Sequence, residues 1–143
     1  MREYLFRGIS PYTGKWIEGG LVHQTDYYGM EVDRYYIIDG TNTNDYDIGE
    51  PERVYPESVG QYTGLTDKNG TKIFEGDIVS TDLKRPYNIV MFRSGCFVFN
   101  CNDGGDDYYD RMIPFSDYES SVYDGVVIGN VYDNPELLSR ETK

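Results

Sequence analysis

The sequence predicts an all-β protein. Turn-forming residues (Gly, Asn, Asp and Pro) recur roughly every ten residues, and the segments between them are rich in Tyr, Val, Ile and Phe. This alternation is typical of short strands joined by tight turns. No window carries the sustained apolar i, i+3, i+4, i+7 spacing of an amphipathic helix, so helices are not expected to build the core.

The first part of the chain is expected to form three strands and a linker. Residues 5–9 and 16–22 are predicted strands on either side of a turn-rich segment. A third strand is expected at 35–38, after a loop near Gly29. Residues 39–57 have few apolar side chains and several Asp, Glu and Pro residues, so we expect a loop or linker there.

The second part opens on a predicted hairpin around Asn69-Gly70. This dipeptide supplies the two positive-φ positions that a tight hairpin turn needs. The segment Glu75–Asp77 is expected to be a turn in which Gly permits a sharp bend and the Asp carboxylate accepts backbone N–H groups. A strand then begins at Ile78.

Three further elements complete the prediction. Residues 87–92 and 96–101 are expected to form a second hairpin, and residues 126–132 a late buried strand. A short helical turn is expected at 135–138, with Asn134 as its N-cap and Pro at its first position. We expect two regions that pack together as one unit, residues 1–57 and residues 58–143.

The composition indicates a cellular compartment and excludes some classes of ligand. The chain has no apolar run of about 18 residues, so no membrane-spanning helix is expected, and its opening residues do not resemble a secretory signal. Cys96 and Cys101 lie five apart on one predicted strand, too far apart for an intrachain disulfide, so a reduced cytoplasmic chain with small core or half-buried thiols is expected. The formal net charge is −12, which disfavours general nucleic-acid binding because that needs clustered Lys and Arg.

The acidic charge is concentrated near the C-terminus. Residues 101–136 contribute −8 of the −12. Four of these carboxylates lie within eight residues beside two glycines and could converge on a hard cation such as calcium, although a solvated acidic loop is the favoured interpretation. These candidate ligands are Asp103, Asp106, Asp107 and Asp110.

Tyrosine is unusually frequent, with 15 residues. Exposed tyrosines are good interface anchors, because they bury much area at a low entropic cost. Adjacent strand residues face opposite ways, so each Tyr-Tyr pair is expected to place one ring inward and one outward. The candidate interaction residues are Tyr27, Tyr28, Tyr108 and Tyr109.

Two blocks of sequence resemble the YopX family of phage and prophage proteins. The central block runs from Val59 to Gly70 and continues from Ile73 to Val79, and the closing block runs from Ile128 to Leu138. The opening Phe6-Arg7-Gly8 with Trp16 agrees with both. The resemblance implies an SH3-like small β-barrel in the central and C-terminal part, with an N-terminal β extension, in a bacterial cytoplasm; it implies no activity, cofactor or catalytic residue.

The sequence therefore favours a non-enzymatic protein-interaction module that binds another protein or itself as a homo-oligomer. No glycine-rich phosphate loop is present, and the single histidine, His23, has no nucleophile or orienting acid at a motif spacing. An acidic mimic of DNA that inhibits a host nucleic-acid-binding protein is the alternative, because of the −8 segment. A metal-dependent enzyme is the third hypothesis, and it rests on the four aspartates.

Overall fold

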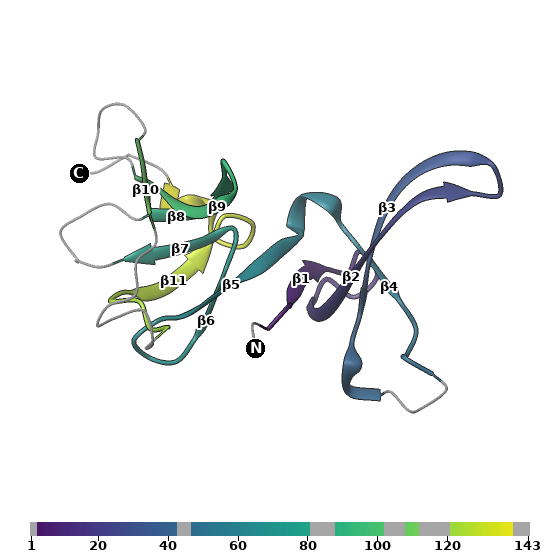
Figure 1. Cartoon of the computed structure of the whole chain (residues 1–143), viewed down its shortest axis with the longest axis horizontal. Coiled ribbons are helices and arrows are strands. Elements are labelled where there is room, and N and C mark those ends of the chain that lie inside the picture. The colour runs from purple at the N-terminus through teal and green to yellow at the C-terminus, as the bar shows by residue number, and fades with distance from the viewer. Residues whose placement is uncertain (1–2, 43–46, 81–87, 102–107, 112–120, 139–143) are drawn as a thin grey trace. The chain divides into compact units, whose positions relative to one another are not determined.

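The elements of the fold are strands and single helical turns, as a computed structural model of the chain shows (Figure 1). The structure describes residues 3–42, 47–80, 88–101, 108–111 and 121–138. Contacts divide the chain into unit 1, Met1–Tyr62, and unit 2, Thr63–Lys143, and each unit is described by itself. None of the helices in the described ranges is long and apolar enough to cross a membrane.

Unit 1 is an antiparallel sheet of β1 (Phe6–Ile9), β2 (Trp16–Tyr27), β3 (Met30–Ile38) and β4 (Glu52–Val54), with the start of β5 (Gly60–Thr66) beside β1. The strand order is β4-β3-β2-β1-β5. Its apolar core includes Ile9, Ile37 and Val54, which are almost inaccessible to solvent. β2 and β3 are both longer than predicted. Residues 23–27 extend β2 and residues 30–34 extend β3, so the loop expected near Gly29 is reduced to a tight turn.

The predicted linker at 39–57 is wrong in part, because it contains β4. This strand pairs with Tyr35, Tyr36 and Ile37 of β3 and buries Val54 in the core. Two short 3-10 helices flank it, η1 (Gly40–Asn42) and η2 (Pro56–Ser58). A three-residue edge strand with a single apolar anchor leaves too little periodicity to be recognised in sequence.

Hydrogen bonds from η2 and the end of β4 hold the first strand in place. The Tyr55 N–H donates to the Ile9 carbonyl at 2.9 Å. The buried Ser58 hydroxyl accepts the Ile9 N–H at 2.8 Å and donates to the Tyr55 carbonyl at 2.7 Å. The sheet therefore curls until the end of β4 meets β1.

Unit 2 contains the rest of β5, β6 (Lys72–Phe74) beside it, and a five-stranded antiparallel sheet. That sheet has the order β10-β9-β8-β7-β11, formed by β7 (Asp77–Ser80), β8 (Asn88–Arg93), β9 (Cys96–Cys101), β10 (Tyr108–Arg111) and β11 (Val126–Asn130). The predicted hairpin between residues 88 and 101 is confirmed: Arg93 lies opposite Cys96, and the turn residues Ser94 and Gly95 both have positive φ. The core cluster is Ile73, Val79, Val90 and Phe99, with Leu65, Tyr123 and Val127 packed against it.

The all-β prediction is confirmed, but the SH3-like barrel is not. The described strands form two antiparallel sheets and no closed barrel. The chain after β11 forms the single turn η3 (Pro135–Leu138), and Asn134 does not cap it as predicted. Its amide oxygen instead accepts the Asn130 N–H at 3.2 Å, so the side chain is directed back toward β11.

The turn around Asn69-Gly70 also differs from the prediction. Only Gly70 has positive φ, at 85°, so the turn is not the two-residue type that Asn-Gly favours. Asp67 decides the geometry, because its Oδ1 accepts the N–H groups of Asn69 and Thr71, both at 2.9 Å. An aspartate that bonds its own turn competes with the local preference of the dipeptide.

Candidate functional site

A projecting β-hairpin in unit 1 is the candidate site. We call residues Gly20–Ile38 of β2 and β3 the arm; it extends beyond the other strands of unit 1 (Figure 1). β1 pairs with β2 only from Trp16 to Gly19, and β4 pairs with β3 only from Tyr35 to Ile37. Among the described residues, the outer part of the arm is therefore a two-stranded ribbon, whose side chains are mostly exposed on both faces.

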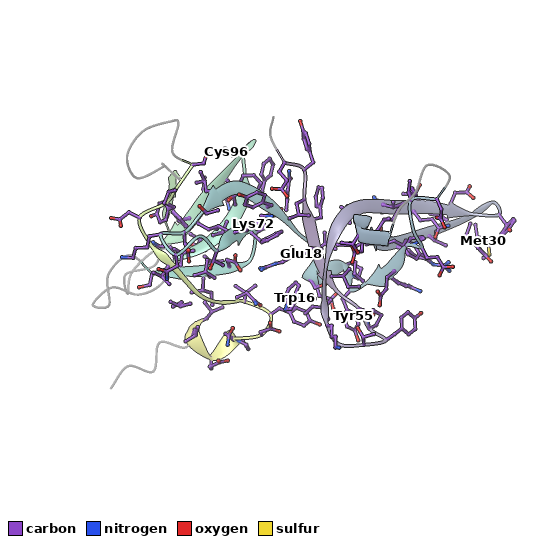
Figure 2. All side chains as sticks on the ribbon, turned by 90° about the horizontal axis from the view of Figure 1, so that it is seen from below. Trp16, Glu18, Met30, Tyr55, Lys72 and Cys96 are labelled. Atoms are coloured by element: carbon purple, nitrogen blue, oxygen red, sulfur yellow. The ribbon has the colours of Figure 1, made fainter. Side chains whose placement is uncertain are left out.

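The tip of the arm presents aromatic and apolar side chains. We call Tyr27, Tyr28, Gly29 and Met30 the tip, and Figure 2 shows Met30 at the far end of the arm from Trp16. Tyr27 lies opposite Met30, and Tyr28-Gly29 is the two-residue loop between them. The exposed fractions are 92% for Tyr28, 59% for Met30 and 42% for Tyr27. The prediction that one ring of this pair points inward is wrong, because Tyr28 lies in the turn.

The backbone of the tip is strained at a tyrosine. Tyr28 has φ of 50° and Gly29 has φ of 83°, so both turn residues are left-handed. Glycine and asparagine adopt this conformation readily, whereas other L-residues incur a steric cost of about 1–2 kcal/mol. A bulky residue at this position makes the fold less stable than glycine or asparagine would. Strained residues of this kind cluster at functional sites.

Side chains along the arm hold the ribbon in shape. The His23 ring stacks on the Tyr35 ring, with centroids 4.3 Å apart, and its Nε2 lies 2.6 Å from Oδ1 of Asp33. The Arg34 guanidinium lies 5.1 Å from the centre of the Tyr27 ring. Cross-strand contacts of these kinds each contribute several tenths of a kcal/mol, about 0.2–1, so the tip is carried on an ordered support.

Acidic side chains flank the tip. Asp26 lies directly opposite Glu31, one step behind the tyrosines. Its carboxylate accepts the Gly29 N–H at 3.0 Å, which helps to close the turn. Like charges opposite one another on a ribbon are destabilising, so this pair is a second local cost at the tip. The ligand best matched to this surface offers an apolar pocket for a ring and cationic groups for the two carboxylates.

The structure does not describe the side chains of the other predicted site residues. Asp103, Asp106 and Asp107 lie outside the described residues. Tyr108, Tyr109 and Asp110 belong to β10, opposite Cys101, Asn100 and Phe99, but their side chains are not described. In the described ranges no cluster of three or more His, Cys, Asp or Glu residues could hold a metal ion. Cys96 is a free thiol and is exposed, so the prediction that it is buried or half-buried is wrong.

Two buried carboxylates among the described residues of unit 2 bind the backbone. Besides the turn, Asp67 accepts the Val127 N–H at 2.9 Å through Oδ2, although only 2% of the residue is exposed. It therefore fastens the β5–β6 turn to β11. Asp77 accepts the Phe74 N–H at 2.8 Å, as the predicted Glu75–Asp77 turn requires. Both aspartates have structural partners of the kind that buried carboxylates need.

An open depression lies at the base of the arm. It has a volume of about 380 Å³ and is lined by Tyr12, Tyr36, Glu50, Pro51, Glu52 and Arg53. Tyr36 lies opposite Arg53, and its hydroxyl donates to Oε1 of Gln24 at 3.3 Å. Because two rings, two carboxylates and a guanidinium share this lining, the depression favours no single class of ligand.

The tyrosines of the tip are predictable from the sequence, but their neighbours are not. Met30, Arg34 and the His23–Asp33 pair depend on the cross-strand register of the arm. The signal for this hairpin is Tyr28-Gly29, a two-residue turn between two strands. Because neither strand shows apolar alternation, the whole segment resembles a loop in the sequence. A one-residue bulge opposite Thr25 further hides the register.

Comparisons with known proteins add a family and one fold. The sequence model of the family described as YopX protein matches residues 5–139. A crystal structure of protein EF1440 from Enterococcus faecalis is similar at a TM-score of 0.56 and 26% identity, covering 97% of this chain and 100% of that one. No curated protein matches the chain.

Proposed function

Because this chain belongs to the YopX family, whose sequence model matches residues 5–139, we propose that it is a phage- or prophage-encoded accessory protein acting as a non-enzymatic protein-interaction module in the bacterial cytoplasm. The tip of the arm is its binding surface. The observation that carries the proposal is Tyr28, whose ring is almost fully exposed on a backbone that is strained for a tyrosine. Selection for stability alone would favour asparagine or glycine there.

The non-enzymatic character is supported by what the polar side chains do. Asp67 and Asp77 bind backbone N–H groups, and His23 is engaged by Asp33 and Tyr35 in a cross-strand cluster. These contacts account for the roles of three titratable groups in the stability of the fold. A buried acid or base without such a partner would point to catalysis instead.

The partner we propose is a protein with an apolar pocket rimmed by Lys or Arg. The pocket receives a tyrosine ring, as interface anchors do, and the basic rim faces Asp26 and Glu31. Salt is expected to weaken this complex, because the attraction between exposed charges is screened over about 8 Å at physiological ionic strength.

A co-purification experiment tests the proposal. The tagged full chain is used to capture proteins from bacterial cells, next to a Tyr27→Ser/Tyr28→Ser variant and a Tyr12→Ser control that removes an exposed ring from another turn of unit 1. We expect one partner with the wild type and with the control, and at least a tenfold loss with the double variant, about 1.4 kcal/mol. A partner retained by the double variant, or no partner above background, contradicts the proposal.

We also propose that unit 2 corresponds to the SH3-like barrel that the family resemblance implies. Its short strands surround one apolar cluster, and Gly76 bends the chain sharply between β6 and β7, at φ of 86°. An experimental structure of unit 2 in which the first and last strands pair would support this assignment, and two sheets that remain open would contradict it.

The acidic mimic of DNA gains no support from the described residues. Its segment includes residues 102–107 and 112–120, which lie outside them. It stays a prediction, as does a cation bound by the four aspartates.

A further inference from the structure

Met30 holds a thioether in solvent at the end of the arm. The residue is 59% exposed, and Figure 2 shows its side chain standing out from the far end of β2 and β3. Met91, the other methionine among the described residues, is half-buried in β8, opposite the buried Val98. Met1 and Met112 lie outside the described residues. Of the two described thioethers, that of Met30 is therefore far easier for a solute to reach.

The Met30 side chain belongs to the apolar surface of the tip. Met30 lies directly opposite Tyr27, and residues opposite one another in an antiparallel pair share a face of the ribbon. The Tyr27 ring in turn contacts the Tyr28 ring edge-to-face, with centroids 4.7 Å apart. A partner whose pocket receives these rings therefore also removes the Met30 thioether from water.

We propose that Met30 is an oxidation site and that its sulfoxide releases the partner bound by the tip. The oxidant is a hydroperoxide. The Met30 sulfur attacks one peroxide oxygen, an S–O bond forms as the O–O bond breaks, and the proton of the transferred hydroxyl passes to the departing oxygen, which leaves as water or an alcohol. Sulfur is oxidised by two electrons and the peroxide is reduced by two. Methionine sulfoxide reductases reverse the step.

The polarity of the product explains the release. A methionine thioether is apolar and adaptable, whereas a sulfoxide is polar and carries a strong hydrogen-bond acceptor. An apolar pocket that closes over the Met30 sulfoxide takes water from this oxygen without replacing the hydrogen bond, which costs free energy. In the unbound chain the oxygen stays in water, because the Met30 side chain is exposed. Oxidation is therefore expected to weaken the complex and to leave the stability of unit 1 unchanged.

Peptide mass spectrometry tests the site in a Cys96→Ser/Cys101→Ser background, which removes the exposed Cys96 thiol as a competing target. The full chain is treated with hydrogen peroxide, and the gain of an oxygen atom is followed in the peptide of each methionine. We expect Met30 to be oxidised at least about fivefold faster than Met91, because the peroxide reaches sulfur from solvent. The urea midpoint reported by Trp16 should not change while only Met30 is oxidised. Equal rates for Met30 and Met91 overturn the proposal.

Capture of the partner from a cell extract tests the release. Only the tagged chain is oxidised, and the peroxide is removed before the extract is added. We expect at least about tenfold less partner than with the untreated chain, about 1.4 kcal/mol, and recovery of the partner after incubation with methionine sulfoxide reductase and a thiol. Each variant is compared with its own untreated sample: the loss should persist in Met91→Leu, the matched control, and disappear in Met30→Leu.

This inference rests on the proposed function, because the tip must bind a partner that oxidation can release, but the two fail in different ways. If the double tyrosine variant loses the partner and the oxidised chain keeps it, release by oxidation is refuted and the proposed function stands. The same holds if Met30→Leu loses the partner on oxidation as Met91→Leu does. If the double tyrosine variant keeps the partner, or no partner is captured, the proposed function is refuted and the release is refuted with it.

Discussion

Replacing Tyr28 by asparagine should stabilise unit 1 while it removes binding. Tyr28 sits at φ of 50°, in the first position of a two-residue turn where asparagine is strongly preferred. Relief of the left-handed strain is worth about 1–2 kcal/mol. The edge-to-face contact with Tyr27, at 4.7 Å and 83°, is lost, and for a ring this exposed it contributes about 0.5 kcal/mol.

The net expected gain is about 0.5–1.5 kcal/mol in the free energy of unfolding. The assay is urea unfolding followed by the fluorescence of Trp16, the only tryptophan in the sequence. Its ring lies 4.6 Å from the Arg7 guanidinium in unit 1, so it reports on the unit that carries the arm. With a urea dependence of about 2 kcal/mol per molar, the unfolding midpoint should rise by about 0.3–0.8 M.

Tyr28→Ala is the matched control, because it removes the same ring without relieving the backbone. We expect it to lose about 0.5 kcal/mol, so that the asparagine and alanine variants differ by at least about 1 kcal/mol. Both variants should lose the partner in the co-purification. Equal stability of the two variants would refute the claim that Tyr28 is kept at the cost of strain.

Three further predictions concern other contacts. Asp67→Asn should destabilise unit 2 by about 2–4 kcal/mol, since an amide cannot accept all three backbone N–H groups, and faster hydrogen exchange in β11 would show it. Gly129→Ala should destabilise the same unit by about 1–3 kcal/mol, because its Cβ would lie 2.5 Å from the Asn134 amide oxygen; thermal unfolding measures this against Gly40→Ala, where nothing lies within 4 Å. For Asp39, hydrogen bonds from the Thr41 N–H and hydroxyl hold the pKa of the carboxyl below its ordinary value, so its contribution to stability is present above about pH 3.9 and is lost as the pH falls through the lowered pKa. Asp39→Asn should therefore lower the urea midpoint at pH 7 and leave it unchanged well below pH 3.9, whereas a loss that is independent of pH would contradict this cause.

How much the sequence could predict depended on whether structure was encoded locally. Strands with apolar alternation and tight turns, such as the hairpin between residues 88 and 101, were recognised because their signals lie within a few residues. The turn type at Asn69-Gly70 differs from the prediction because the Asp67 carboxylate accepts the Asn69 and Thr71 N–H groups and overrides the preference of the dipeptide. The same carboxylate also accepts the Val127 N–H, sixty residues away, which no local pattern contains. β4 was missed because an edge strand with one apolar anchor, Val54, has no period to detect.

The site followed the same rule. Tyr27 and Tyr28 were found as a compositional feature, but their arrangement depends on pairing across the arm. The opposition of Asp26 to Glu31, and the contact of His23 with Asp33, follow from a register that a bulge shifts by one residue. A sequence pattern cannot predict such a register when both strands are polar. A shift of the pairing by one residue would then move no apolar face from the core to solvent, so no register is clearly favoured.

The two blocks of sequence that carry the family resemblance and the residues that form the candidate site perform different physical tasks. In the central and closing blocks, Asp67, Asp77 and Asn134 bind backbone groups, so these blocks specify how unit 2 folds. The tip lies in unit 1, outside both of these blocks. A partner identified for another member should therefore transfer to this chain only if that member also exposes an aromatic ring at the turn of its arm. Family membership by itself predicts the fold and not the binding surface, because buried hydrogen bonds constrain the sequence far more tightly than an exposed turn does.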